Sequence, residues 1–114
     1  MRRLLDTIVL RNSHNVYETD LGFEVTQIDP HGAEYKYTVS REAADLLCTL
    51  CAGQCVTAKE ASLRLAPHAK KLALPYHYGH KLHYYTQEIL LVLTASGRAT
   101  RRKVGREFKY QVTG

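Results

Sequence analysis

Apolar and polar residues alternate with a period of two in much of the stretch 1–40, which is the pattern of β-strands with one buried face. The clearest strands are predicted over 23–28 and 33–39. Between them, Asp29-Pro30-His31-Gly32 has Asp, Pro and Gly at the positions that a type I turn prefers. The pattern therefore predicts an N-terminal β-hairpin, to which short strand candidates over 7–10 and 16–20 could add.

The hydrophobic period then lengthens to that of a helix. Ser40 is a good N-cap, and apolar residues at helical spacing follow it until Gly53, so a first helix is expected over about 41–52. Thr57-Ala58-Lys59-Glu60 has the spacing of a capping box, which predicts a second helix over about 58–66. Residues 67–79 contain two prolines, and this stretch is expected to form either one helical turn or a loop.

A third helix is expected from about Gly79 to Ser96, with Gly97 ending it. On this helix the residues largely off the apolar stripe are Lys81, Tyr84, Gln87 and Glu88. The stripe consists of Leu82, Tyr85, Ile89, Val92 and Leu93. After Gly97, alternating residues around a turn at Val104-Gly105-Arg106 predict a C-terminal β-hairpin.

Charge adds a second feature to that hairpin. The chain has 114 residues and a formal net charge of +5, and residues 97–114 contain six basic side chains and one acid, which equals the whole net charge. Such a local basic patch favours an anionic partner, and double-stranded nucleic acid is the commonest one. The hairpin is therefore the first candidate for a binding surface.

Composition narrows the class of protein. The length fits one domain with a real core, and 45% hydrophobic with 24% charged residues is ordinary globular composition. No apolar run approaches the roughly 20 residues that a membrane-spanning helix needs. Three cysteines, an odd number, argue against a disulfide framework and fit a reducing environment. We therefore expect a cytoplasmic protein, nucleoid-associated if it binds DNA.

The stretch from Leu90 to Tyr110, with Thr57 ahead of the second helix, resembles the winged helix-turn-helix superfamily of DNA-binding proteins. The resemblance covers roughly residues 40–113. It implies an α+β fold of three helices and a C-terminal β-hairpin wing, here with an N-terminal β-hairpin extension over 1–39 and a compact winged-helix domain over 40–114. It also implies a transcriptional regulator whose third helix enters the major groove of duplex DNA while the basic wing holds phosphates.

The resemblance assigns nine candidate contacts to DNA. Those on the third helix are Lys81, His83, Tyr84 and Gln87, and those on the wing are Arg98, Arg101, Arg102, Lys103 and Arg106. Strand alternation puts Arg101 and Lys103 on one side of the wing and Arg102 on the other, so they cannot all reach one row of phosphates. A homodimer is expected, because two-fold operators are common and an N-terminal strand edge could pair across a dimer axis.

A protein-interaction module on the same fold is the alternative. It would be an adaptor or a phage-type inhibitor that binds an acidic protein partner or blocks a nucleic-acid site. Four tyrosines within ten residues would then form the interface, since aromatic side chains are enriched in protein contacts. They are Tyr76, Tyr78, Tyr84 and Tyr85.

Catalysis and cofactors are not expected. The sequence has no Gly-rich phosphate loop, no G-x-S-x-G and no HExxH motif, so we predict that the chain is not an enzyme. A zinc site is the remaining possibility, although helical phase favours Cys51 as a small buried side chain. The candidate ligands would be Cys48, Cys51, Cys55, His77, His80 and His83.

Overall fold

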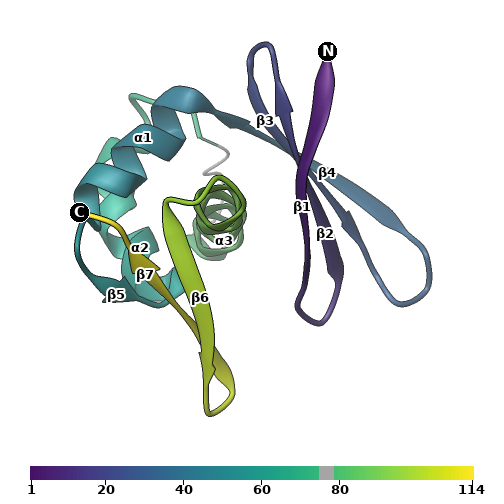
Figure 1. The fold of residues 1–114 in the computed structure, drawn as a ribbon. Coiled ribbons are helices and arrows are strands. Elements are labelled where there is room, and N and C mark those ends of the chain that lie inside the picture. The colour runs from purple at the N-terminus through teal and green to yellow at the C-terminus, as the bar shows by residue number, and fades with distance from the viewer. Residues whose placement is uncertain (75–78) are drawn as a thin grey trace.

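The N-terminal part of the chain forms a four-stranded antiparallel sheet in the computed structural model (Figure 1). The structure describes the backbone of residues 1–74 and 79–114, and all of their side chains except those of 79–81. The strands pair in chain order and are β1 (Arg2–Val9), β2 (Ser13–Thr19), β3 (Gly22–Ile28) and β4 (Glu34–Ser40).

The N-terminal β-structure expected over 1–39 is therefore present, but it is a four-stranded sheet and larger than the predicted hairpin. The predicted hairpin is β3–β4, with its turn where the sequence indicated it, but β2 pairs with β3 along its whole length and β1 pairs with β2. The register of β1 shifts between Leu4 and Asp6. Such an irregularity breaks the alternation of period two, which is why β1 was only partly visible in the sequence.

The turn between β3 and β4 is held by Asp29. The amide of Gly32 donates to the Asp29 carbonyl at 3.0 Å. The Asp29 carboxylate accepts from the amides of His31 and Ala33 at 2.9 and 3.0 Å. The aspartate thus closes the turn with its own side chain, as an Asx turn does.

Both helix starts that the sequence predicted are confirmed. Helix α1 (Arg41–Leu50) begins with the Ser40 side chain accepting from the amide of the third helical residue. Helix α2 (Ala58–Leu65) begins with a complete capping box, in which Thr57 and Glu60 bind each other's amides at 2.9 and 3.1 Å. The first helix ends at Leu50, slightly before the expected boundary.

The third helix and its stop signal also agree with the sequence. A short 3-10 helix, η1 (Ala66–His68), follows α2, and helix α3 spans Gly79–Ala95. Gly97 adopts a φ of 81°, which favours glycine, and the Arg98 amide donates to the Leu93 carbonyl at 2.8 Å. None of the described helices is long and apolar enough to cross a membrane.

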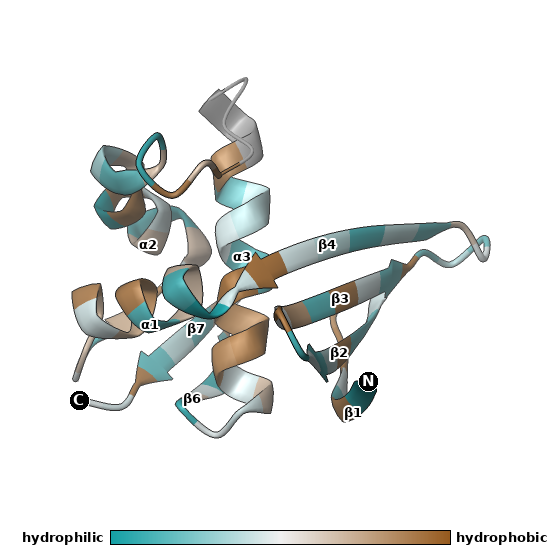
Figure 2. Cartoon of the chain, turned by 90° about the horizontal axis from the view of Figure 1, so that it is seen from above, coloured by the Kyte–Doolittle hydropathy of each residue, from teal (hydrophilic) through white to brown (hydrophobic). Residues whose placement is uncertain are grey.

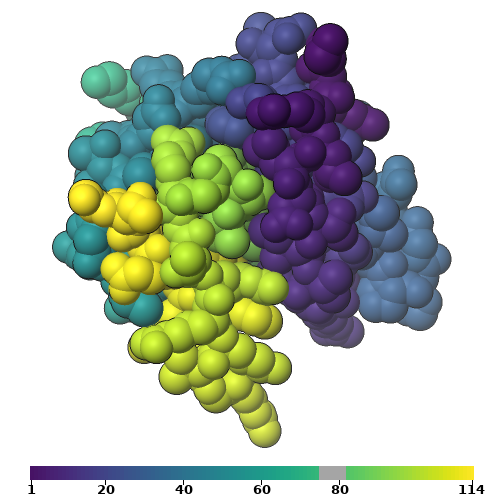
Figure 3. All heavy atoms as spheres, in the orientation of Figure 1, coloured from purple at the N-terminus to yellow at the C-terminus, as the bar shows by residue number. Residues whose placement is uncertain are grey.

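The predicted C-terminal hairpin is present as β6 (Ala99–Val104) and β7 (Glu107–Val112). A strand that the sequence did not indicate, β5 (Cys55–Val56), pairs with β7, so the strand order is β5-β7-β6. Because β5 lies directly before α2, it ties the hairpin to the start of that helix. Figure 3 shows the β6–β7 hairpin, in yellow-green, projecting beyond the rest of the molecule.

Helix α3 lies at the centre of the fold, with α1 and α2 on one side and the four-stranded sheet on the other (Figures 1 and 2). All five residues of its predicted apolar stripe are buried, and so are Leu90 and Leu91. The second half of α3 is accordingly the most continuous hydrophobic stretch in Figure 2. One hydrophobic core therefore includes both the sheet and the helices.

Glu88 lies off the predicted apolar stripe of α3 and is nevertheless buried. It is 2% exposed, and its Oε2 lies 3.2 Å from Nδ1 of His14, which is 1% exposed. Two polar side chains are thus paired inside the core between β2 and α3. The reason is tertiary: α3 is covered on the sheet side as well, so a residue off the helical stripe still meets protein.

Candidate nucleic-acid interface

A cleft of about 310 Å³ lies between the start of α2, the first half of α3 and the β6–β7 hairpin. We call it the α2–α3–hairpin cleft. Three of the nine predicted contact residues line it, namely His83, Gln87 and Arg106. The other lining residues are Thr57, Ala58, Lys59, Glu107, Phe108 and Tyr110.

Local structure explains why these side chains meet. The capping box at Thr57 fixes the first turn of α2 and so directs Lys59 to the cleft. His83 and Gln87 are four residues apart on α3, which places them one above the other on the same side of the helix. Gly105 and Arg106 form the turn between β6 and β7, which holds Arg106 at the far wall.

The hairpin presents two more cations on its cleft side. In the β6–β7 register Lys103 is paired with Phe108 and Arg101 with Tyr110, so all four side chains share a face. The guanidinium carbon of Arg101 lies 4.6 Å, and Nζ of Lys103 5.9 Å, from the centre of the Phe108 ring. The aromatic ring thus holds two positive charges beside the cleft.

Arg101 also connects the hairpin to the N-terminal sheet. Its Nη1 donates to the carbonyl of Val9 at 3.3 Å, at the end of β1. Tyr110, its partner across the strands, is 1% exposed, and burial raises the pKa of this phenol to about 12, so it is neutral at physiological pH. The cleft side of the hairpin is therefore built on a buried neutral ring and carries its charge at the rim.

The remaining predicted contacts lie elsewhere. Arg102 is on the opposite face of the hairpin by strand register. It lines a hollow of about 260 Å³ with Cys55, Thr100 and Gln111, and Arg101 also borders this hollow. Arg98 turns away from the cleft and forms an ion pair of 2.7 Å with Asp45 of α1. Tyr84 is 58% exposed on α3, with its ring centre 5.5 Å from that of His83.

Some predicted residues lie outside the described part of the chain. The side chain of Lys81 is one of them, as are His77, Tyr76 and Tyr78 and the side chain of His80. Of the two tyrosines of the alternative protein interface that are described, Tyr85 is 6% exposed and donates its hydroxyl to the Thr38 carbonyl at 2.5 Å. Tyr85 is therefore part of the core and not of a contact surface.

The cysteines do not gather with histidines in the described part of the chain. Cys51 is buried at the end of α1, where burial raises the pKa of its thiol, whereas Cys48 is half-buried and Cys55 is exposed. Among the described residues, no group of three cysteine, histidine or acidic side chains is arranged to hold a metal ion.

Sequence reasoning missed Lys59, Phe108 and the connection from Arg101 to Val9. The capping box gave a signal for Lys59, because it fixes the rotation of the first turn of α2. The contact with Val9 joins residues 92 positions apart, so nothing local could indicate it. No protein-family model matches the chain, and no similar curated protein or solved structure is found.

Proposed function

We propose that the chain is a winged-helix protein that binds duplex DNA and acts as a transcriptional regulator. In this proposal β6–β7 is the wing, and the α2–α3–hairpin cleft and its rim face the DNA. The observation that carries the proposal is that Lys59 and Arg106 line the cleft, while Arg101 and Lys103 lie close to the Phe108 ring in its wall. Glu107 is the acid among the cleft's lining residues.

In this proposal the wing and α3 have different roles in binding DNA. Lysine and arginine at the wing would bind phosphates, which fixes position without reading sequence. His83 and Gln87 on α3 carry ring and amide groups that can hydrogen-bond base edges, and glutamine pairs well with adenine in the major groove. Arg98 and Arg102 are left out of the proposed interface, because Arg98 pairs with Asp45 of α1 and the register puts Arg102 on the face of the hairpin opposite Phe108 and Tyr110.

The test is a fluorescence-anisotropy titration of a random-sequence duplex at several salt concentrations. Each phosphate contact contributes about 0.9 to the slope of log affinity against log salt. The double variant Lys103→Ala/Arg106→Ala is therefore expected to lower that slope by about 1.8 and to weaken binding at low salt.

The matched control is Arg2→Ala/Lys36→Ala. It also removes two positive charges, but from a pair that shares Glu24 on the sheet, away from the cleft. It is expected to keep most of the duplex affinity. Equal losses in the two double variants, or wild-type binding that does not depend on salt, would contradict the proposal and favour a protein partner.

A homodimer remains part of the proposal. Within the described residues, β1 and β4 are the edge strands of the N-terminal sheet, and their free edges could pair with a second copy. Light scattering during size-exclusion chromatography tests this directly. A mass of one chain at concentrations where duplex binding is complete would exclude the dimer.

A further inference from the structure

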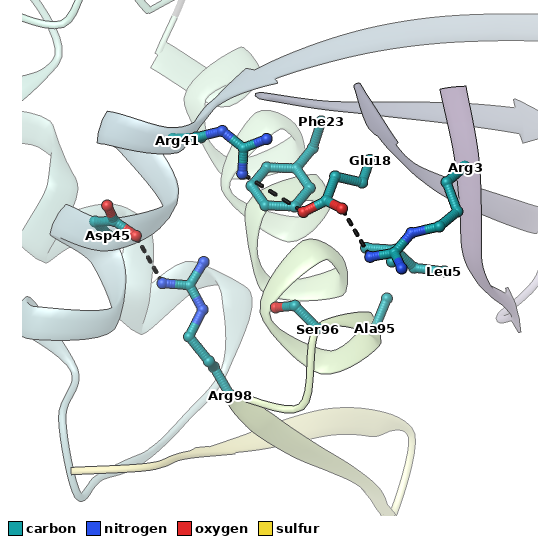
Figure 4. Close-up of a pocket in the computed structure, with 9 residues that line it drawn as sticks. All are labelled: Arg3, Leu5, Glu18, Phe23, Arg41, Asp45, Ala95, Ser96 and Arg98. Carbon is teal, nitrogen blue, oxygen red and sulfur yellow. Dashed lines mark hydrogen bonds and ion pairs between the residues drawn. The ribbon is translucent and has the colours of Figure 1, made fainter. Parts of the chain in front are cut away.

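A second cavity, of about 480 Å³, lies between the N-terminal sheet and the helices, and it shares no lining residue with the α2–α3–hairpin cleft (Figure 4). Its volume falls in the range of sites for small molecules. Figure 4 shows three arginines reaching it from different elements: Arg3 from β1, Arg41 from the start of α1 and Arg98 from the loop after α3.

The cavity has fewer carboxylates than guanidiniums. Glu18 is shared, at 2.7 Å by Arg3 and at 3.5 Å by Arg41. The guanidinium of Arg98 forms a separate ion pair with the Asp45 carboxylate at 2.7 Å. Three positive groups thus face two negative ones, and one further anion would balance the charge.

Such an anion can displace the Asp45 carboxylate from Arg98. The Asp45 side chain is 69% exposed, and solvent-exposed ion pairs contribute little to stability. Arg98 uses Nη1 for Asp45, and no other hydrogen bond of its guanidinium is present among the described residues. A planar guanidinium has five N–H donors, so most of those of Arg98 are available to a ligand oxygen.

The cavity also has an apolar part. Phe23 is 4% exposed, and the guanidinium carbon of Arg41 lies 5.4 Å from the centre of its ring. Leu5 and Ala95 line the same space (Figure 4). A ligand that combined a small apolar group with a charged end would match both parts.

We propose that this cavity binds a small organic oxyanion, a phosphate monoester or a carboxylate with a compact apolar group. The oxyanion lies between Arg41 and Arg98, and the apolar group lies against Phe23. Because the lining comes from the sheet, α1 and the end of α3, the bound ligand joins the N-terminal sheet to the helices.

The experiment is isothermal titration calorimetry of the whole chain, without DNA, using phenyl phosphate and benzoate as probes and phenol as the uncharged control. Saturable binding of phenyl phosphate or benzoate, without binding of phenol, is expected. Which of the two binds more tightly identifies the charged end that the site prefers.

The variants Arg98→Gln and Arg41→Gln are each expected to weaken that binding by about tenfold or more, since each removes a charge-assisted hydrogen bond. Arg2→Gln is the matched control, because it breaks an arginine–carboxylate pair on the sheet outside the cavity. Far-ultraviolet circular dichroism checks that all three variants are folded. The proposal is overturned if neither anion saturates, if phenol binds equally well, or if Arg2→Gln weakens binding as much as the cavity variants do.

Discussion

The buried pair of His14 and Glu88 gives the sharpest test of how the fold is held together. The two side chains are 1% and 2% exposed and lie 3.2 Å apart, and they connect β2 to α3. Replacing one partner by leucine leaves the other polar group buried without its partner. Removing one member of a buried pair typically costs about 3–5 kcal/mol.

That loss is large for a domain of this size, whose total stability is on the order of 5–15 kcal/mol. The single variants His14→Leu and Glu88→Leu are therefore each expected to shift the urea midpoint strongly. The double variant replaces both polar groups by apolar ones of similar size, and such exchanges are often neutral or stabilising. It should recover most of what either single variant loses.

Urea unfolding followed by circular dichroism measures all four proteins, with the slope of the transition checked for constancy. A positive coupling of about 3 kcal/mol or more across the cycle is expected. The reasoning is refuted if each single variant loses less than about 1 kcal/mol, which is the size of an ordinary hydrogen bond. It is also refuted if the double variant loses the sum of the two.

Three further predictions use other parts of the molecule. Thr57→Ala removes the capping box of α2 and is expected to cost about 1 kcal/mol in urea unfolding, whereas Thr57→Ser should restore it. Burial raises the pKa of Tyr85 and Tyr110 from 10.0 to about 12, so their contribution to stability is complete below pH 10 and is lost as the pH rises toward 12. Between these two pH values, ionisation of each tyrosine lowers the free energy of unfolding by about 1.4 kcal/mol per pH unit. A Tyr85→Phe variant should therefore lose less stability in this range, as unfolding measured at alkaline pH can show. A thiol reagent should modify the exposed Cys55 quickly and the buried Cys51 only at the rate of unfolding, as mass spectrometry of the labelled chain can measure.

Local signals predicted local structure well. The caps at Ser40 and Thr57 and the glycine at 97 marked helix ends correctly, because each acts through hydrogen bonds or backbone angles within a few residues. The strand β5 was missed because two residues are too few to show a period. The size of the N-terminal sheet was missed because β1 contains an irregular register.

The candidate sites depended more on distant contacts. Strand alternation correctly separated Arg101 and Lys103 from Arg102. The placement of Arg98 depends on Asp45, 53 positions away, and the burial of Glu88 depends on His14, 74 positions away. Counting charges along the sequence cannot anticipate such pairs, because each partner is brought in by a distant part of the chain, as Asp45 of α1 is for Arg98.

The central place of α3 has a consequence for the order in which the chain is synthesised. The four strands of the sheet are neighbours in the sequence, so they can pair as soon as residues 1–40 have left the ribosome. The helix that covers their apolar face spans Gly79–Ala95 and emerges much later. Until then Val16, Phe23 and Val25 face water, and the nascent chain exposes a surface to which other chains can adhere. A lower rate of expression, or co-expression of a chaperone that binds unfolded chains, should therefore raise the yield of soluble protein.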